Sequence, residues 1–287
     1  METLDPVYEH LGTARQEFSC CDTEFIVQAS GLRAGAAVKV ARQTAELLET
    51  QFNAFSAESA VSHLNREGVL THEHVARVVR RGLEYYDRTD GVFDIQQGQT
   101  ERSVKRFLWG DDDSLRVQFD RGTVEVEGDR VSTDCRLDLN GLAKGYIVDR
   151  AASALDGIGR QGFVSGGGDM SAPTGPIAVE NPAGGRPLRT LETDWCVATS
   201  AGHRRSRGDV DHIYDPTAER VSSRHDSVTV LARRDCMEAD ALATTLAATP
   251  LASARSLAEE WGGLEALIVH EGVFYTTEGF DDHVAGT

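Results

Sequence analysis

The sequence predicts an α+β protein with mixed and antiparallel sheets and packed helices. Three observations favour this class: strand-like and helix-like segments alternate irregularly, several strands are joined by tight turns, and no repeat or low-complexity linker divides the chain. The 287 residues, 40% of them hydrophobic, are enough to bury a substantial core. We therefore expect one domain over residues 1–287, in which residues 1–17 form a polar N-terminal segment.

The first half of the chain alternates predicted strands with amphipathic helices. Apolar residues at helical spacing predict helices over about 36–52 and 74–86, and Ser59 is a suitable N-cap for a short helix over 59–65. Period-two alternation predicts antiparallel strands over 113–139, including 115–119, 124–126 and a last strand at 137–139. The remaining strand predicted here covers 24–28.

The second half begins with a helix and continues with more strands than helices. Asn140-Gly141 is a turn signal before a helix that runs to Leu155. Strands are expected at 162–170, 177–179, 194–198 and 227–232, and a hairpin around Glu271-Gly272 closes the chain. Helices are expected over 238–248 and again after Pro250, which suits a first helical turn.

The charge balance excludes several classes of partner. The net charge is −17, and lysine occurs only as Lys39, Lys105 and Lys144. Such acidity argues against binding nucleic acid or an anionic membrane, and no apolar run is long enough for membrane insertion. With no signal peptide, we expect a cytoplasmic protein. An acidic, lysine-poor surface is typical of adaptation to a high-salt, halophilic cytoplasm, and we prefer this interpretation to ordinary acidic solubility.

The cysteines predict neither disulfides nor a zinc site. Cys20, Cys21, Cys135, Cys196 and Cys236 are odd in number and contain no C-x-x-C pair. We therefore expect free, partly buried thiols.

Lys144 is the first candidate for a functional residue. It lies in the first turn of the predicted helix after Asn140-Gly141, where the helix dipole disfavours a cation unless an anion is bound. A chain with three lysines has kept one of them at a position suited to phosphate. The alternative is an ordinary strand–turn–helix with a solvated lysine.

A metal site is predicted on the helix over 238–248. Asp240 and Thr244 are four residues apart and so share one helix face. A carboxylate and a hydroxyl are oxygen ligands suited to Mg²⁺. A solvated helix face is the usual alternative, but the alanine-rich neighbours indicate close packing, in which an aspartate needs a partner.

Three further segments carry candidate chemistry. His212 precedes Asp215 by three residues and could be a general base oriented by that carboxylate, or a surface histidine beside an Asp-Pro turn. Thr199 and Ser200 end a predicted strand and offer hydroxyl groups. Phe93-Asp94 could hold a flat heteroaromatic ring or simply cap a turn.

Taken in order, these segments resemble the FAD:protein FMN transferases, the ApbE-type flavin transferases. The family motif D-L-G-G-x-A-K-G-Y resembles residues 138–146, and T-x-G-x-F-D matches 89–94. Similar matches to S-x-x-S-x-x-N, G-G-D, T-S-G…H-I-x-D-P and A-D-A-L-x-T-A lie at 59–65, 167–169, 199–216 and 239–245. The resemblance covers most of the chain and implies an ApbE-like, T-fold-like architecture.

The resemblance implies a specific reaction and site. Such enzymes bind FAD and Mg²⁺ and transfer FMN to a serine or threonine hydroxyl of an acceptor protein, releasing AMP. His212 would take the hydroxyl proton, and Asp240, Thr244 and the carbonyl of Ala143 would hold Mg²⁺. The FAD contacts implied by the resemblance are Phe55, Val92, Phe93, Asp94, Asn140, Lys144, Ser200 and Ile213.

Some positions depart from the family pattern, and two other functions stay open. Cys21-Asp22-Thr23 stands where the family often has Met-Gly-Thr, Ala201 follows Thr199-Ser200 in place of glycine, and Asn140 replaces the first glycine of its motif. Hydrolysis of FAD to FMN and AMP would use the same metal site. A non-catalytic FAD-binding protein would need no base, so His212 argues against it.

Overall fold

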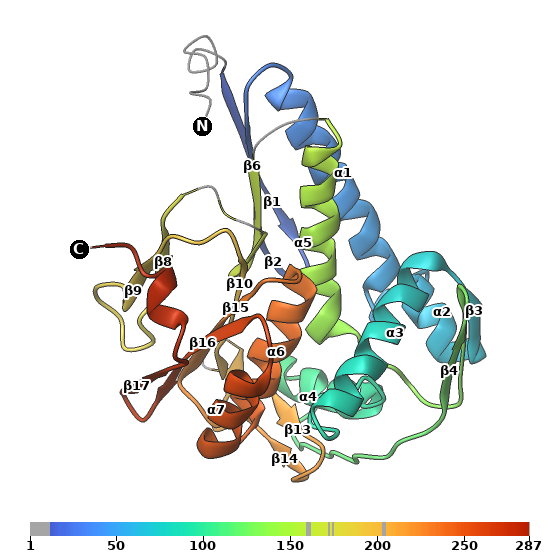
Figure 1. Cartoon of the computed structure of the whole chain (residues 1–287). Helices are drawn as coiled ribbons and strands as arrows, with labels where there is room; N and C mark the ends of the chain where they lie inside the picture. Colours follow the sequence, from blue (N-terminus) through green and yellow to red (C-terminus); the bar gives the residue numbers. More distant parts are fainter. Residues whose placement is uncertain (1–11, 159–161, 172, 174, 203–204, 287) are drawn as a thin grey trace.

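An eight-stranded antiparallel sheet organises the fold, which confirms the predicted α+β class. The computed structural model describes residues 12–158, 162–171, 173, 175–202 and 205–286. The strand order is β1-β2-β6-β7-β10-β15-β16-β17 (Figure 1). These strands are β1 Thr13–Cys20, β2 Thr23–Ser30, β6 Gly162–Gly166, β7 Asp169–Ser171, β10 Cys196–Ser200, β15 Ser227–Ala232, β16 Leu264–His270 and β17 Val273–Thr276.

Three long helices lie on one face of this sheet (Figure 1). They are α1 Ala34–Phe52, α5 Asn140–Asp156 and α6 Cys236–Ala248. α1 packs on β1 and β2, α5 on β6, and α6 on β10 and β15. Small residues allow the close approach: every residue of α6 except Thr244 is buried. The predicted tight packing of this helix is therefore confirmed.

The opposite face of the sheet has its own small core. The hairpin of β8 Ile177–Val179 and β9 Arg189–Leu191 contributes to it, with the 3-10 helix η3 Phe280–His283. Leu231 and Leu267 from the sheet pack into this second cluster. Because both faces of the sheet are covered, all six residues of β15 are buried.

The remaining elements flank the main layers. Helices α2 Ala60–Glu67 and α3 Glu73–Arg88 pack on the small sheet β3 Val69–Thr71, β5 Arg130–Thr133 and β4 Val124–Glu127. α7 Leu251–Glu260 packs on α6 and β16. The others are α4 Gly98–Trp109 and the strands β11 Ser206–Arg207, β12 Val210–Asp211, β13 Tyr214–Asp215 and β14 Arg220–Val221. No helix within the described ranges is long and apolar enough to cross a membrane.

Two of the predicted strands are wrong. Residues 115–119 alternate between exposed and half-buried positions but form no ladder. Leu137 to Leu139 form no ladder either, because the Asn65 amide takes the place of a neighbouring strand. Its Nδ2 donates to the Leu137 carbonyl at 3.0 Å and its Oδ1 accepts from the Leu137 N–H at 2.7 Å.

β1 and α4 are among the elements that were not predicted. β1 begins at Thr13, inside residues 1–17, which were expected to form a polar N-terminal segment. Residues 1–11 lie outside the described part of the chain. α4 was missed because its buried positions include Thr100 and Glu101, so that its sequence lacks an apolar stripe.

Candidate functional site

A cavity of about 340 Å³ collects most of the predicted site residues. It is bounded by α5, α6 and the segments around 92–101 and 199–214, which are far apart in the sequence. The predicted residues on its wall are Val92, Phe93, Asp94, Asn140, Lys144, Ser200, His212, Asp240 and Thr244. Thr244, the one residue of α6 that is not buried, faces this space.

The other three predicted residues lie elsewhere. Phe55 and Ala143 line a smaller hollow of about 80 Å³ that shares Lys144 and Asn140 with the main cavity. Phe55 is 41% exposed and packs against Trp109 and Lys105. Ile213 is 1% exposed and belongs to the main core, so a contact from its side chain to a ligand stays a prediction.

Lys144 is bound by protein carboxylates instead of being solvated. Its Nζ forms ion pairs with Asp169 and, at 3.3 Å, with Asp240 Oδ1. Burial opposes the charged form, but the two carboxylates outweigh burial and raise the pKa of Lys144 above its usual value. The second oxygen of Asp240 accepts from the Gly145 N–H at 3.1 Å. The first turn of α5 is therefore joined directly to the middle of α6.

Asp169 carries an unusual buried oxygen. The turn after β6 uses Gly167 and Gly168 at positive φ, 59° and 104°, which only glycine adopts readily, and it brings Asp169 beneath Lys144. The carboxylate is fully buried, and its Oδ1 has no hydrogen-bond partner within the described residues. Burial and the nearby Asp240 raise the pKa of Asp169 well above its ordinary value.

The donor atoms around Asp240 fit a hard divalent cation. Thr244 Oγ1 lies 3.3 Å from Ser200 Oγ, so two hydroxyls stand beside the Asp240 carboxylate on the same cavity wall. Asp169, which shares Lys144 with Asp240, is a second carboxylate beside this wall. Oxygen donors of this kind, with one or two carboxylates, are those that Mg²⁺ accepts in proteins. The residues present therefore fit the predicted metal.

His212 lies on the cavity wall, but Asp215 does not orient it. Asp215 accepts hydrogen bonds from the N–H and hydroxyl of Thr217, at 3.0 and 2.6 Å, so it stabilises a turn. His212 Nδ1 is buried without a partner among the described residues. Burial, followed by the positive charge of Arg205, lowers the pKa of His212 to about 4. The imidazole is therefore neutral near pH 7 and able to accept a proton.

A polar network on the cavity wall joins the predicted Asn140 to three residues that were not predicted, Glu101, Asp138 and Tyr214. Asp138 accepts from Tyr214 Oη at 2.6 Å and from Asn140 Nδ2 at 2.7 Å. Glu101 Oε1 also accepts from Asn140 Nδ2, at 3.1 Å, and pairs with Lys105 at 3.0 Å. Burial and the charge of Asp138 raise the pKa of Glu101 to about 7. The scarcity of lysine, which pointed to Lys144, would also have pointed to Lys105.

Phe93 and Asp94 both line the cavity, and Asp94 also stabilises a turn; that they hold a flat ring stays a prediction. The Phe93 ring is 8% exposed, packs at right angles to Tyr85 and lines the cavity. Asp94 accepts from the Gln96 N–H at 3.0 Å and lies 3.1 Å from Arg121, so its carboxylate stabilises the turn and also borders the cavity. This segment can offer one apolar ring edge and one acceptor to a ligand.

Comparison with known proteins gives a consistent result. The chain is 27% identical over 240 residues to a FAD:protein FMN transferase of Vibrio cholerae, covering 70% of each protein. Its fold matches that of the ApbE protein of Thermotoga maritima with a TM-score of 0.83 and 23% identity, covering 96% of this chain and 100% of the other. The flavinyl transferase ApbE of Pseudomonas stutzeri gives 0.78 and 21%, covering 96% and 98%. The ApbE family model matches residues 21–268, and the chain therefore belongs to the ApbE family.

Proposed function

We propose that this protein transfers FMN from FAD to a serine or threonine hydroxyl of an acceptor protein. The acceptor oxygen forms a bond to the phosphorus of the FMN half, the bond to the AMP half breaks, and the hydroxyl proton passes to a base. The observation that carries this proposal is the convergence of nine predicted residues on one cavity. Membership of the ApbE family, with a relative named FAD:protein FMN transferase, supports it.

His212 is the base in this proposal. A neutral imidazole whose Nδ1 has no partner within the described residues can accept the hydroxyl proton without first breaking another contact. A pKa near 4 makes it a weak base in the absence of ligand. A bound pyrophosphate would raise that pKa, because a nearby negative charge stabilises the imidazolium.

Asp240, Thr244 and the carbonyl of Ala143 would hold Mg²⁺. Asp240 and Thr244 line the main cavity, and Ala143 lines the smaller hollow that shares Lys144 with it. The ion would offset the charge of the pyrophosphate oxygens when bound. Lys144 binds Asp169 and Asp240 at once, so its part is to fix the two carboxylates relative to each other.

A polar heteroaromatic ring would be recognised by the polar wall of the cavity, formed by Glu101, Asp138, Asn140 and Tyr214. Hydrogen bonds of 2.6 to 3.1 Å between these side chains already orient their donors and acceptors. Pre-oriented groups lose little freedom on binding, which favours affinity. Phe93 would supply the apolar contact beside them.

Intact-mass measurement of an acceptor tests the reaction. The protein is incubated with FAD, Mg²⁺ and an acceptor that carries a serine/threonine flavinylation motif, at the high salt suggested by the acidic composition. We expect an FMN adduct on the acceptor and one AMP for each adduct. AMP without an adduct would instead indicate FAD hydrolysis, and tight FAD binding without AMP would indicate a storage protein. An acceptor in which the hydroxyl residue is alanine is the control.

A further inference from the structure

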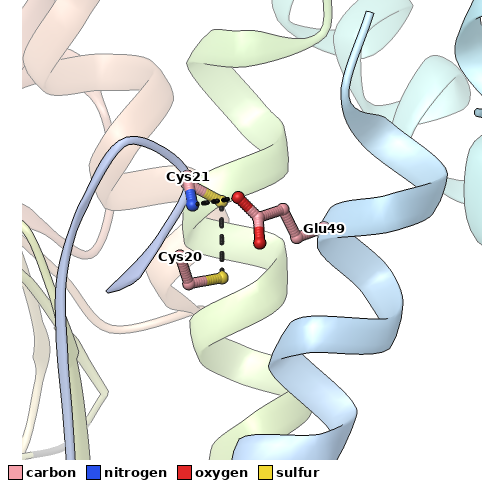
Figure 2. A group of neighbouring side chains, drawn as sticks. All are labelled: Cys20, Cys21 and Glu49. Atoms are coloured by element: carbon pink, nitrogen blue, oxygen red, sulfur yellow. Dashed lines mark hydrogen bonds between the residues drawn. The ribbon is translucent and has the colours of Figure 1, made fainter. Parts of the chain in front are cut away.

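Cys20, Cys21 and Glu49 form a cluster outside the main cavity. Figure 2 shows both thiols and the carboxylate directed toward one another, from the β1–β2 hairpin and from α1. The two sulfurs are 3.8 Å apart, and the ligand atoms of all three residues lie within 4.8 Å of one another. The proposed transfer reaction uses none of these side chains.

Backbone geometry holds the cluster together. The β1–β2 hairpin pairs Cys20 with Thr23, so Cys21-Asp22 is a two-residue turn. Both turn residues have positive φ, 54° and 56°, as a type I′ turn requires, although neither is glycine or asparagine. The Cys21 N–H donates to Glu49 Oε1 at 2.6 Å, which fixes the carboxylate next to the thiols.

The spacing fits a tetrahedral thiophilic cation. Two sulfurs each about 2.3 Å from a tetrahedral zinc ion are about 3.8 Å apart. The observed sulfur separation is the same 3.8 Å, and Glu49 adds an oxygen that zinc also accepts. A disulfide would require the sulfurs to close to about 2.05 Å. The separation of the two reduced thiols therefore matches that of two ligands of one tetrahedral ion.

The position of the cluster provides access for an ion. Cys20 is only 1% exposed, but Cys21 and Glu49 line the smaller hollow beside the main cavity. Solvent can thus supply both the ion and a fourth ligand. Among the described residues, this is the one group of three or more histidine, cysteine or acidic side chains with metal-ligand spacing.

We propose that Cys20, Cys21 and Glu49 form a site for Zn²⁺, with a fourth position open to water. The sequence argued against zinc because it contains no C-x-x-C pair, but the third ligand comes from another element of the fold. On binding, the two thiols form bonds to zinc and release their protons to solvent, so zinc affinity falls as the pH is lowered.

Cobalt titration of the reduced, metal-free chain tests the site. Co²⁺ takes the place of Zn²⁺ and gives a sulfur-to-cobalt charge-transfer absorption when thiolates bind it. Excess Mg²⁺ is present to occupy oxygen-ligand sites such as that of Asp240. We expect one equivalent of Co²⁺ with this absorption, displaced by one equivalent of Zn²⁺.

Two variants and two controls make the result specific. Cys21→Ser should abolish the absorption and weaken Zn²⁺ binding by more than about 100-fold, and Glu49→Gln should keep the absorption but weaken binding about 10- to 100-fold. Both substitutions avoid the fully buried Cys20, and thermal unfolding without metal checks that they fold. Cys135→Ser and Glu46→Gln change a thiol outside the cluster and a half-exposed carboxylate of α1, so both should bind as the wild type does.

Three outcomes overturn the proposal. One is a reduced wild-type protein that shows no charge-transfer absorption, and another is a Cys21→Ser variant with unchanged zinc affinity. The third is a protein that binds no Zn²⁺ when reduced but forms a Cys20–Cys21 disulfide under an oxidant, seen as a loss of two hydrogens in the intact mass. The two thiols would then be a redox pair.

Discussion

The cavity has two walls that are stabilised in different ways. The helix wall, defined by Lys144, Asp240 and Thr244, is set by the packing of α5 on α6, where the Gly145 N–H donates to Asp240. The loop wall, defined by Glu101, Asp138, Asn140 and Tyr214, is set by hydrogen bonds between side chains. An atom added between α5 and α6 should therefore disturb fold and site together. Removal of one side-chain group from the loop wall should leave the fold intact.

The largest expected effect is that of Asp240→Ala in the helix wall. Loss of this carboxylate removes the proposed Mg²⁺ ligand while Lys144 keeps its ion pair with Asp169, so the chain should still fold. We expect FMN transfer to fall at least about 1,000-fold, or about 4 kcal/mol in the barrier. Adduct formation measured by mass checks this. Glu238→Gln, a buried carboxylate of the same helix outside the cavity, is the control; transfer retained in Asp240→Ala would rule out the metal assignment.

Gly145→Ala should be the most damaging change to the fold. An added Cβ would lie 2.5 Å from the Cys236 carbonyl oxygen and 2.7 Å from Met237 Cα, both backbone atoms that cannot move aside. We expect a loss of about 3 kcal/mol in the free energy of unfolding, measured with denaturant, together with loss of transfer. Gly157→Ala at the end of α5 meets its first neighbour at 3.4 Å and should be neutral or slightly stabilising. Equal stability of the two variants would contradict the packing argument.

His212 should make stability depend on pH. The unfolded histidine binds a proton below about pH 6.5, whereas the folded one does so only below about pH 4. Acid therefore favours the unfolded chain between these values, and as the pH falls from 6.5 to 4 wild type should lose about 3 kcal/mol relative to His212→Gln. Chemical unfolding of both proteins across this range measures the difference. A constant difference would mean that His212 is not held neutral by the fold.

Tyr214→Phe in the loop wall should have the smallest effect. It removes one hydrogen bond of 2.6 Å, but Asp138 keeps those from the side chain and N–H of Asn140. We expect a loss of about 1 kcal/mol in stability, and FAD binding weakened about fivefold. Calorimetric binding and thermal unfolding report the two effects. The control is Tyr275→Phe in β17, where the Tyr275 ring packs against Arg255. This variant should change neither stability nor FAD binding. A comparable loss in the control would make the Tyr214 result nonspecific.

The sequence predicted the helix wall better than the loop wall, for a physical reason. α5 and α6 combine regular helical spacing with small residues, and regular backbone fixes where Lys144, Asp240 and Thr244 point. The family resemblance, confirmed by the match over residues 21–268, added which of these side chains to expect at the site.

The loop wall depends on contacts between distant residues that no local pattern reveals. Asn65 binds the backbone of Leu137 72 positions away, and this contact, not a β-ladder, holds the segment that carries Asp138. Glu101 lies on a helix whose buried face is polar, so neither the helix nor its site role was predicted. The same long-range folding brings Glu49 to Cys20 and Cys21, which the spacing of cysteines could not indicate.

The central claim is that the two walls bind one molecule, with its pyrophosphate at the metal and its ring at the loop wall. It is tested most directly by the affinity for FAD with and without Mg²⁺, in wild type and in Asp240→Ala. If Mg²⁺ contacts the pyrophosphate of bound FAD, Mg²⁺ strengthens FAD binding, and FAD strengthens Mg²⁺ binding by the same factor. We predict that Mg²⁺ tightens FAD binding to wild type and has no effect on Asp240→Ala. Equal FAD affinity of wild type with and without Mg²⁺ would contradict the account.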